Sequence, residues 1–241
     1  MNILDSIKTS ILTPIHPAGL PFIALFSILT LIIGWIWTPL YYIGFTLTLW
    51  CIYFFRNPPR TTPILSGSNK NNLIISPADG TVIDIAKTAP AEDIGLPEGK
   101  WKRVCIFMNV FDVHVNRSPM AGEITFKKYV PGSFFNASLD KASDKNERLI
   151  LNMDTENGNK IAFVQIAGLV ARRIICDVDI GNSLKAGEIF GLIRFGSRVD
   201  IYFPSEVSVM VLKGQKMIAG ETIIGDFSKN AKSVKETVDE K

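Results

Sequence analysis

The chain has 241 residues, of which 47% are apolar and 20% are charged, and its formal net charge at pH 7 is +3. This balance excludes an intrinsically disordered chain, and the small net charge excludes the strongly basic footprint of a nucleic-acid-binding domain. The three cysteines lie far apart among apolar neighbours, which indicates buried thiols in a reducing compartment rather than a disulfide framework.

The most apolar part of the chain lies near the N-terminus. No Asp, Glu, Lys or Arg occurs from Thr9 to Phe55, a run that is too long for one membrane span of about 20 residues and suits two. Gly34 and Pro39 interrupt the run near its middle. We therefore expect a helical hairpin with the halves Leu20–Trp37 and Pro39–Phe55. The aromatic residues at the break are typical of a membrane–water interface; they are Trp35, Trp37, Tyr41 and Tyr42.

Basic residues flank this run, with Lys8 before it and Arg56 and Arg60 after it. Basic flanks on both sides favour a hairpin whose two ends are cytoplasmic, which places the rest of the chain on the cytoplasmic side of the cell membrane. Because both halves are short, a re-entrant or interface-lying hairpin on a peripheral protein stays open. A buried hairpin of a soluble domain also stays open, although an all-round apolar surface lacks the polar stripe of a surface helix.

After residue 60 the pattern changes to short alternating or apolar runs separated by Gly, Pro, Asn and Asp, which is typical of a β-rich domain. The segments 87–100 and 152–160 are predicted to be surface loops. We predict three parts: a hairpin with its basic flank over 1–60, a β-rich domain over 61–226 and a polar tail over 227–241. The predicted strands are Leu73–Ile75, Thr81–Ile85, Val104–Met108, Glu123–Tyr129, Ile161–Ile166, Arg173–Val178, Ile189–Ile193, Val199–Phe203 and Glu206–Leu212.

Two weak internal repeats occur in this domain. The segment SLKAGEIFG at 183–191 is similar to QKMIAGETIIG at 215–225, and SPADGTV at 76–82 is similar to SPMAGEI at 118–124. Paired hairpins of this kind occur in barrel-sandwich folds such as biotinyl and lipoyl carrier domains, where Gly supplies positive φ at tight turns. The expected fold is therefore mainly β, a barrel-sandwich-like domain preceded by the helical hairpin. In a carrier, Lys216 would be the candidate attachment site.

Few residues in the chain are candidates for chemistry. His16 has no polar neighbours and is interpreted as an interfacial residue, whereas His114 lies where polar groups alternate from 112 to 116, on one face of a strand. Asp79 lies in an Asp-Gly turn, and Ser197 follows Gly196 in a turn between strands, both ordinary features. No nucleophile elbow or metal-ligand spacing occurs. Asp79, His114 and Ser197 form the one complete Asp/His/Ser set that spacing offers.

Six longer segments of the chain reduce the number of possible functions. NPPR, ISPADGTV, FMNVFDVHVNRSPMAGEI, NASLDKASDKNER, GLVARRI and RFGSRVDIYFP, in this order, resemble the phosphatidylserine decarboxylase proenzyme family in its short form. The resemblance extends from the end of the hairpin to Gly225. It implies self-cleavage between Gly196 and Ser197 into a β chain, 1–196, and an α chain, 197–241, capped by a pyruvoyl group. It further implies that this cofactor forms a Schiff base with phosphatidylserine, releasing CO2 and phosphatidylethanolamine.

The resemblance also implies roles for the candidate residues. Ser197 would attack the carbonyl of Gly196, with His114 as the base that takes the hydroxyl proton and Asp79 as the group that orients the imidazole ring. His114 would also supply a proton in the decarboxylation. We expect these roles because of the resemblance to the family.

The chain departs from the longer family members at one position. Their motif has two histidines three residues apart, whereas here the second position is Arg117, which cannot act as a base. Either His114 serves both reactions, or Arg117 has a different role such as binding the lipid phosphate. Arg172 and Arg173 are further phosphate candidates by their guanidinium geometry, but adjacent residues of a strand point to opposite faces.

Two other functions stay open at this point: a membrane-anchored carrier or adaptor, and a pyruvoyl enzyme acting on a soluble amino acid. A carrier needs neither the Asp/His/Ser set nor the Gly-Ser bond, and the hairpin gives a reason to hold the site at a bilayer. Phosphatidylserine in the bilayer and the two chains of one precursor are therefore the expected partners. Family members are often dimeric, which makes a homodimer an expectation. Neither a metal nor a nucleic acid is expected.

Overall fold

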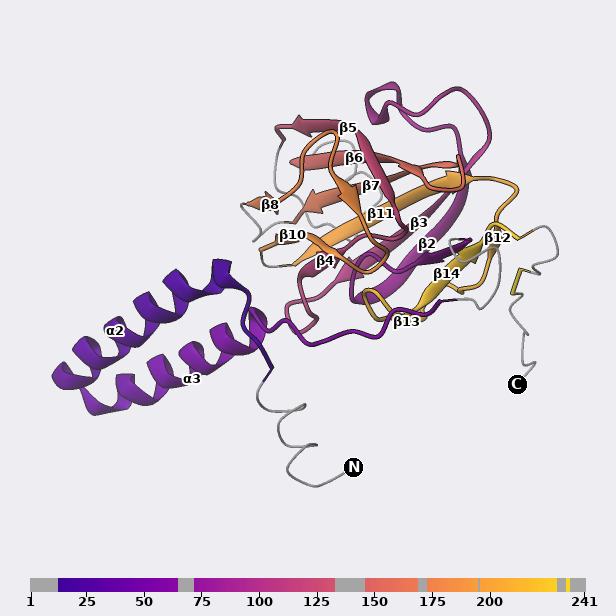
Figure 1. The fold of residues 1–241 in the computed structure, drawn as a ribbon. Helices are drawn as coiled ribbons and strands as arrows, with labels where there is room; N and C mark the ends of the chain where they lie inside the picture. The colour runs from indigo at the N-terminus through magenta and orange to yellow at the C-terminus, as the bar shows by residue number, and fades with distance from the viewer. Residues whose placement is uncertain are drawn as a thin grey trace, which may run out of the picture. The chain divides into compact units, whose positions relative to one another are not determined.

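The computed structural model of the chain describes residues 13–64, 72–132, 146–168, 173–194, 196–228 and 233–234 (Figure 1). These residues fall into two compact units. The first ends at Pro59 and also includes the segment Phe111–Val115, and the second holds the remaining residues.

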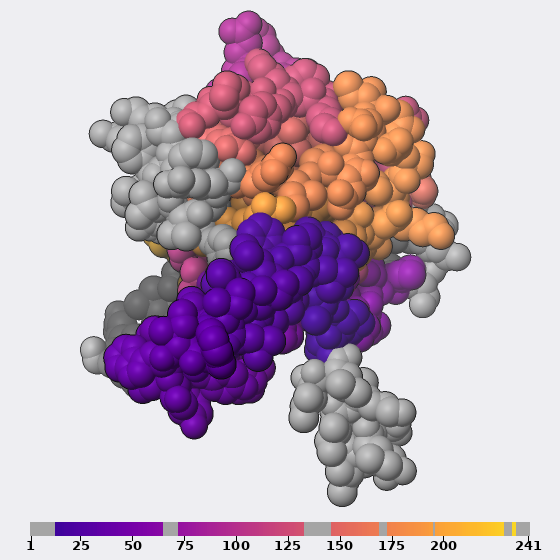
Figure 2. Space-filling view, turned by 90° about the vertical axis from the view of Figure 1, so that its left-hand side faces the viewer, coloured from indigo at the N-terminus to yellow at the C-terminus, as the bar shows by residue number. Residues whose placement is uncertain are grey.

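The first unit is a helical hairpin. A short turn, η1 (Pro17–Gly19), leads into α2 (Leu20–Ile36), and α3 (Thr38–Phe54) runs back beside it (Figure 1, Figure 2). Trp37 separates the two helices in an extended conformation, and a proline lies in the first turn of α3, where its missing N–H breaks no helical hydrogen bond. The two predicted helices are confirmed, with each boundary within one residue.

Small side chains allow the two helices to pack closely. Thr30 and Thr48 face each other with their Oγ1 atoms 3.3 Å apart, and each hydroxyl also donates to a carbonyl of its own helix. A Cβ atom added to Gly44 would lie 2.6 Å from Thr30 Oγ1. Close approach through small residues is the usual packing of helices in an apolar solvent.

The outward surface of the hairpin is apolar. Pro17–Ile36, with 20 residues, is the one helical segment of the described chain that is long and apolar enough to cross a membrane. A contiguous apolar surface of this kind marks an interaction site rather than ordinary protein surface. The exposed large apolar side chains include Leu25, Ile28, Leu31, Ile32, Trp35, Ile36, Tyr42, Ile43, Phe45, Leu47 and Leu49.

The base of the hairpin is closed by backbone hydrogen bonds. The His16 amide donates to the Phe55 carbonyl at 2.8 Å, and the Asn57 amide donates to the Pro14 carbonyl at 2.6 Å. Ile15 and Arg56 form an isolated β-bridge between these bonds. The chain therefore enters and leaves the hairpin as a short antiparallel pair, which fixes the end of α3.

The second unit is mainly β, which confirms the predicted fold class. A curled sheet of eight strands has the order β13-β2-β3-β11-β7-β6-β5-β9, and two three-stranded sheets have the orders β1-β14-β12 and β4-β10-β8 (Figure 1). The strands are β1 (Leu73–Ile75), β2 (Gly80–Thr88), β3 (Trp101–Met108), β4 (Val115–Arg117), β5 (Gly122–Val130), β6 (Arg148–Thr155), β7 (Lys160–Ala167), β8 (Ile174–Cys176), β9 (Ser183–Leu184), β10 (Ile189–Ile193), β11 (Ser197–Pro204), β12 (Ser208–Val209), β13 (Lys216–Met217) and β14 (Ile223–Asp226).

The internal repeats form equivalent structures. In one copy the Gly220 amide donates to the Ser76 carbonyl, and in the other the Gly187 amide donates to the Ser118 carbonyl, each at 2.8 Å. Each serine hydroxyl in turn donates to the carbonyl two residues on, at 2.7 Å. The two glycines have nearly the same positive φ, 78° and 79°. The repeat seen in the sequence is therefore a repeated turn.

One predicted loop is wrong in its first half. Asn152–Lys160 was expected to be a surface loop, but β6 continues to Thr155, and Asn152 and Met153 are buried. β6 pairs with β5 on one side and with β7 on the other, so its polar residues complete two hydrogen-bonded ladders. Asn152 also donates to the Gly95 carbonyl at 3.0 Å. The polar residues of this segment favour a loop in the sequence, although the segment forms part of a central strand.

β11 lies in the middle of the eight-stranded sheet and separates two groups of buried side chains. Val199 and Ile201 belong to the larger apolar core, and Tyr202 belongs to a smaller one on the other face. Because side chains alternate along a strand, Ser197 faces the larger core and Arg198 faces the smaller one.

Candidate active site

Ser197 is the first residue of β11 and is completely buried. It is paired across the sheet with Met108 of β3 and Ala167 of β7. Its hydroxyl oxygen has no hydrogen-bond partner among the described residues. Most buried side-chain hydroxyls have a hydrogen-bond partner, so a buried hydroxyl without one is unusual and calls for an explanation. A hydroxyl in this state is available for reaction.

Gly196 gives the bond before Ser197 an unusual backbone. Its φ is +62°, in the left-handed region that non-glycine residues rarely adopt. A Cβ atom at this position would meet nothing closer than Val110 Cγ1, at 4.0 Å. The glycine is therefore required by the conformation of the turn and not by lack of space.

A buried polar pair lies beside the cross-strand neighbour of Ser197. Gln165 Nε2 donates to Asn116 Oδ1 at 2.8 Å, and Asn116 Nδ2 lies 3.7 Å from Met108 Sδ. All three side chains are fully buried. Sequence reasoning missed Gln165, because a single amide in an apolar strand gives no signal of its own.

Asp79 lies in the turn before β2, at the same end of the sheet as Ser197. The register places Thr81 opposite Phe107, next to the Met108 that pairs with Ser197. The carboxylate of Asp79 accepts hydrogen bonds from Arg60 Nη2 at 2.8 and 3.0 Å, and from the Ala219 amide at 2.8 Å. Arg60 was expected only as a flanking charge of the hairpin, and its separation from Asp79 along the chain gives no signal of this pairing.

Arg117 lies close enough to this ion pair to be affected by its charges. Its Nη1 donates to the Gly187 carbonyl at 3.0 Å. Burial and the charge of Arg60 lower its pKa, while Asp79 and Glu221 act in the opposite direction. The structure thus brings two of the predicted site residues, Asp79 and Arg117, into one charged cluster with Arg60 and Glu221.

His114 lies just before β4, in the segment that belongs to the helical unit, so the prediction that residues 112, 114 and 116 share one face of a strand is wrong. Its ring is fully buried and stacks on Phe54, with ring centroids 4.3 Å apart and planes inclined by 36°. Nδ1 lies 3.0 Å from the carbonyl oxygen of Asp112. Since a carbonyl only accepts, Nδ1 carries the proton and Nε2 is the nitrogen with a lone pair that can accept one.

Burial lowers the pKa of His114 to about 4, the Asp112 hydrogen bond opposes this shift, and the positive charge of Arg56 adds to it. The imidazole is therefore neutral at pH 7. A neutral ring whose Nε2 has its lone pair is the form that a general base requires.

Of the other two predicted phosphate-binding arginines, the structure describes Arg173 and not Arg172. Arg172 lies outside the described residues. Arg173 is exposed just before β8, and its carbonyl accepts a hydrogen bond from the Arg194 amide at 3.2 Å. Burial and the nearby charge of Arg173 lower the pKa of Arg194. These two arginines form a positive pair, and one of them, Arg194, is two residues from Gly196 in the sequence.

The opposite face of the sheet has charged residues of its own. Arg198 and Asp200 are fully buried and form an ion pair, with Nη2 and Oδ2 2.7 Å apart, and Arg198 Nη2 also contacts Cys105 Sγ at 3.1 Å. Burial raises the pKa of the Cys105 thiol, and the carboxylate of Asp200 raises it further. The thiol is therefore neutral and is a packing residue, as predicted from its apolar neighbours.

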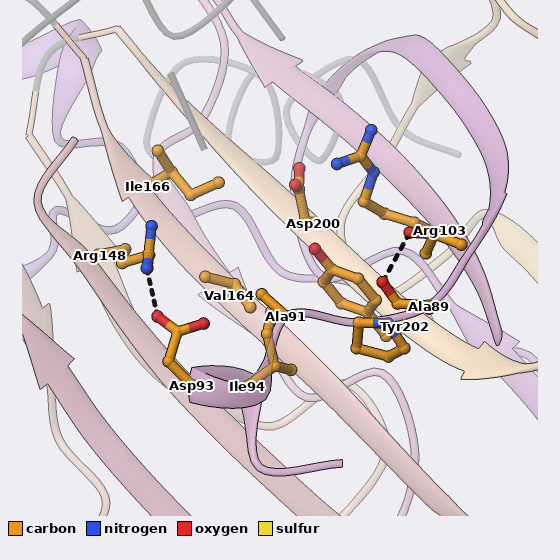
Figure 3. A pocket seen from close by; sticks show the side chains of 12 residues that line it. Ala89, Ala91, Asp93, Ile94, Arg103, Arg148, Val164, Ile166, Asp200 and Tyr202 are labelled. Atoms are coloured by element: carbon orange, nitrogen blue, oxygen red, sulfur yellow. Dashed lines mark hydrogen bonds and ion pairs between the residues drawn. The ribbon is translucent and has the colours of Figure 1, made fainter. Parts of the chain in front are cut away.

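A cavity of about 140 Å³ lies on this same face (Figure 3). Figure 3 shows Arg148 bonded to Asp93 at one side of it and Tyr202 and Asp200 of β11 at the other. Because Asp200 and Tyr202 alternate with Val199 and Ile201, this cavity lies on the face of β11 away from the Ser197 side chain. We do not assign the reaction to it.

Comparison with known proteins identifies relatives over most of the chain. Residues 47–225 match the family model described as phosphatidylserine decarboxylase. The chain is also 51% identical over 220 residues to a phosphatidylserine decarboxylase proenzyme from Ruegeria pomeroyi, which covers 91% of this chain and 98% of that protein. Asp79, His114 and Ser197 all lie within the matched residues.

Proposed function

The chain belongs to the phosphatidylserine decarboxylase family, and we propose that it is a proenzyme that cleaves itself between Gly196 and Ser197 to form its own cofactor. The enzyme is a carboxy-lyase that converts phosphatidylserine to phosphatidylethanolamine and CO2. The observation that carries the proposed cleavage site is the buried Ser197 hydroxyl, which has no hydrogen-bond partner among the described residues and follows a glycine with φ of +62°.

The cleavage is an internal acyl transfer followed by an elimination. The Ser197 hydroxyl attacks the carbonyl carbon of Gly196, a C–O bond forms as the C–N bond breaks, and the hydroxyl proton leaves to His114 while the amine gains one. β-Elimination then releases the carboxylate of Gly196 and leaves dehydroalanine. Addition of water to dehydroalanine releases ammonia and leaves a pyruvoyl group at the start of the α chain, 197–241. The β chain is 1–196.

The residues around Ser197 fit such a group. The side chain points into an apolar core, and its strand neighbours Met108 and Ala167 are buried, which keeps bulk water from the reacting atoms. When present, a pyruvoyl group supplies an electrophilic carbonyl for the substrate amine and an electron sink for the departing carboxylate. His114 is the proposed proton carrier of both reactions. In this structure its Nδ1 is hydrogen-bonded to the Asp112 carbonyl, so the orienting role of Asp79, which is paired with Arg60, rests on the family pattern alone.

We propose that the protein works at the cell membrane with its catalytic domain in the cytoplasm. The exposed apolar side chains of α2 and α3 support a membrane location for the hairpin over 1–60. The proposed catalytic domain spans 61–226, with a polar tail over 227–241. For the lipid phosphate, we favour Arg173 and Arg194 over Arg117, because Arg117 is half-buried, donates to the Gly187 carbonyl and already feels the carboxylates of Asp79 and Glu221. Arg172 remains a candidate from sequence, and the protein is proposed to be a homodimer.

A gel tests the cleavage step. Purified wild-type protein is expected as two chains, and the small one should have the mass of residues 197–241 with a pyruvoyl group at its start. Ser197→Ala should remain one intact band, because it has no hydroxyl to attack Gly196. Ser205→Ala, which changes a serine at the other end of β11, should be cleaved like wild type. An intact wild-type chain, or normal cleavage of Ser197→Ala, contradicts the proposal.

A lipid assay tests the substrate. Vesicles that contain phosphatidylserine should yield phosphatidylethanolamine with the wild-type protein and none with Ser197→Ala. Free L-serine should yield no ethanolamine under the same conditions. Release of ethanolamine from free serine, with no turnover of the lipid, would favour the pyruvoyl enzyme of a soluble amino acid.

A further inference from the structure

The segment that carries His114 is attached to the end of the membrane hairpin. Arg56 Nη2 donates to the Phe111 carbonyl at 2.8 Å, and the Arg56 guanidinium also lies 3.7 Å from the centre of the Tyr53 ring. Three residues further along the segment, the His114 ring stacks on Phe54. One contact fixes the backbone of the segment and the other fixes its functional side chain.

Phe54 is itself held firmly. It is the last residue of α3 and is fully buried. Its ring packs edge-on against Phe55 at 5.0 Å and lies tilted against Trp50 at 5.7 Å. Phe55 in turn stacks on Phe22 of α2 at 5.7 Å and accepts the hydrogen bond that closes the base of the hairpin. The Phe54 ring that contacts His114 is therefore held directly by Trp50 and Phe55, its two aromatic neighbours on α3 and at its end.

We propose that Phe54 is a positioning residue for His114. The last turn of the membrane hairpin would then orient the imidazole for the reaction in addition to anchoring the protein. The proposal rests on the proposed role of His114 as the proton carrier. The Phe54 ring packs against the imidazole, and the Asp112 carbonyl holds Nδ1 through a hydrogen bond. Together they fix the direction in which Nε2 points.

The ring of Phe54 also keeps water from the imidazole. Burial is the largest cause of the low pKa of His114; among the other causes, the Asp112 carbonyl favours protonation and the Arg56 charge disfavours it. Removal of the Phe54 ring admits water and should return the pKa of His114 from about 4 toward the ordinary value of about 6.5. A residue that only filled space far from the imidazole would not move this pKa.

Histidine NMR tests this directly, because the chain has only two histidines, His16 and His114. Full-length Ser197→Ala, which holds the protein as one precursor, is labelled at the imidazole carbons in a lipid nanodisc and titrated from pH 7.5 to 5. The His114 signal is expected to stay in its neutral position throughout. In Ser197→Ala with Phe54→Leu it should shift, with about nine tenths of the ring protonated at pH 5.5. His16→Gln assigns the two signals.

Two further variants serve as controls. Phe22→Leu removes an aromatic ring from the same unit, one contact removed from Phe54, and should leave the His114 titration unchanged. Phe54→Tyr keeps the ring and should restore the neutral signal. An unchanged His114 titration in Phe54→Leu, or an equal shift in Phe22→Leu, overturns the proposal. If Phe54→Leu fails to fold, Phe54→Met replaces it, since a thioether of similar volume fills the site without a ring plane.

Cleavage kinetics separate this inference from the proposed function. A pulse-labelled precursor with Ser197 intact is transferred to pH 5.5 or 7.5, and the two cleavage rates are compared within each variant, which cancels any general loss of fold. The wild-type ratio should be near one, and Phe54→Leu should be about tenfold slower at pH 5.5 than at pH 7.5. If no precursor is cleaved, the proposed function fails while the NMR result stands. Equal ratios in wild type and Phe54→Leu contradict the positioning role.

Discussion

Gly196 combines a conformation that favours glycine with open space around the missing side chain. Its φ is +62°, and the nearest atom to an added Cβ is 4.0 Å away. A left-handed conformation costs most residues about 1–2 kcal/mol, less for Asn, and more for β-branched side chains. Substitutions at this position therefore test backbone conformation without steric collision.

We expect cleavage rates to fall in the order Gly, Asn, Ala and Val at position 196. A strain of about 1–2 kcal/mol corresponds to roughly a tenfold change in the fraction of chains that hold the turn in its reactive shape. The rates are measured by pulse labelling and gel electrophoresis. Equal rates for Asn, Ala and Val would show that the positive φ has no part in the reaction.

The ion pair between Asp79 and Arg60 is mostly buried, with 14% and 12% of the respective side chains exposed. Removal of one partner leaves the other charge poorly compensated, so each single change should destabilise the fold more than a surface pair would. Asp79→Asn and Arg60→Gln are expected to be non-additive, with a coupling of about 1–3 kcal/mol. The double-mutant cycle is measured by denaturant unfolding in the Ser197→Ala background. Additive effects would show that the pair contributes little.

At the scale of elements, the hairpin depends on close packing of its two helices. Gly44 faces Thr30 of α2 without room for a side chain, whereas Thr46 on the same helix is exposed. The face of α3 that carries Gly44 packs against α2. A bulky side chain should therefore destabilise the hairpin when it is added to that face, and not when it is added at Thr46.

Gly44→Leu is expected to separate the helices and to destabilise the hairpin by about 1–3 kcal/mol, because overpacking at a close contact forces the backbones apart. Thr46→Leu adds a similar side chain to the exposed face and should have little effect. Protease sensitivity of α2 and α3 in detergent measures the difference. Equal sensitivity of the two variants would contradict the close packing at Gly44.

At the scale of the whole molecule, the titration of His114 makes the free energy of unfolding depend on pH. Its pKa is about 4 in the folded chain and about 6.5 when unfolded. Because the folded value is depressed, the unfolded chain binds a proton that the folded chain excludes, and stability is lost as pH falls from about 6.5 toward 4.

The Ser197→Ala precursor is therefore expected to lose about 2 kcal/mol of stability through His114 alone between pH 7 and pH 5. His114→Gln, which cannot titrate, should remove this part of the pH dependence although it lowers stability at pH 7. Thermal unfolding midpoints at both pH values check this. An equal loss in both proteins would mean that other groups cause the acid sensitivity.

The sequence predicts those parts of the fold that have a local cause. A long uncharged run with a central break predicts both helices, and alternation with turn residues predicts most strands, because burial of one face imposes its period directly on the chain. The first half of the segment 152–160 is the exception, since the backbone of β6 is paired on both sides although several of its residues are polar. The family, the cleavage bond and the three candidate residues likewise follow from contiguous motifs.

Only the tertiary structure decides which of these residues meet. It pairs Asp79 with Arg60, places Arg117 near their charges, and sets the ring of His114 against Phe54. Most of these partners lie tens of residues apart, so no local pattern in the sequence records them. The sequence by itself determined a family, a hairpin and a mainly β domain. The surroundings that set the charge of His114 and leave the Ser197 hydroxyl available exist only where the folded chain excludes water.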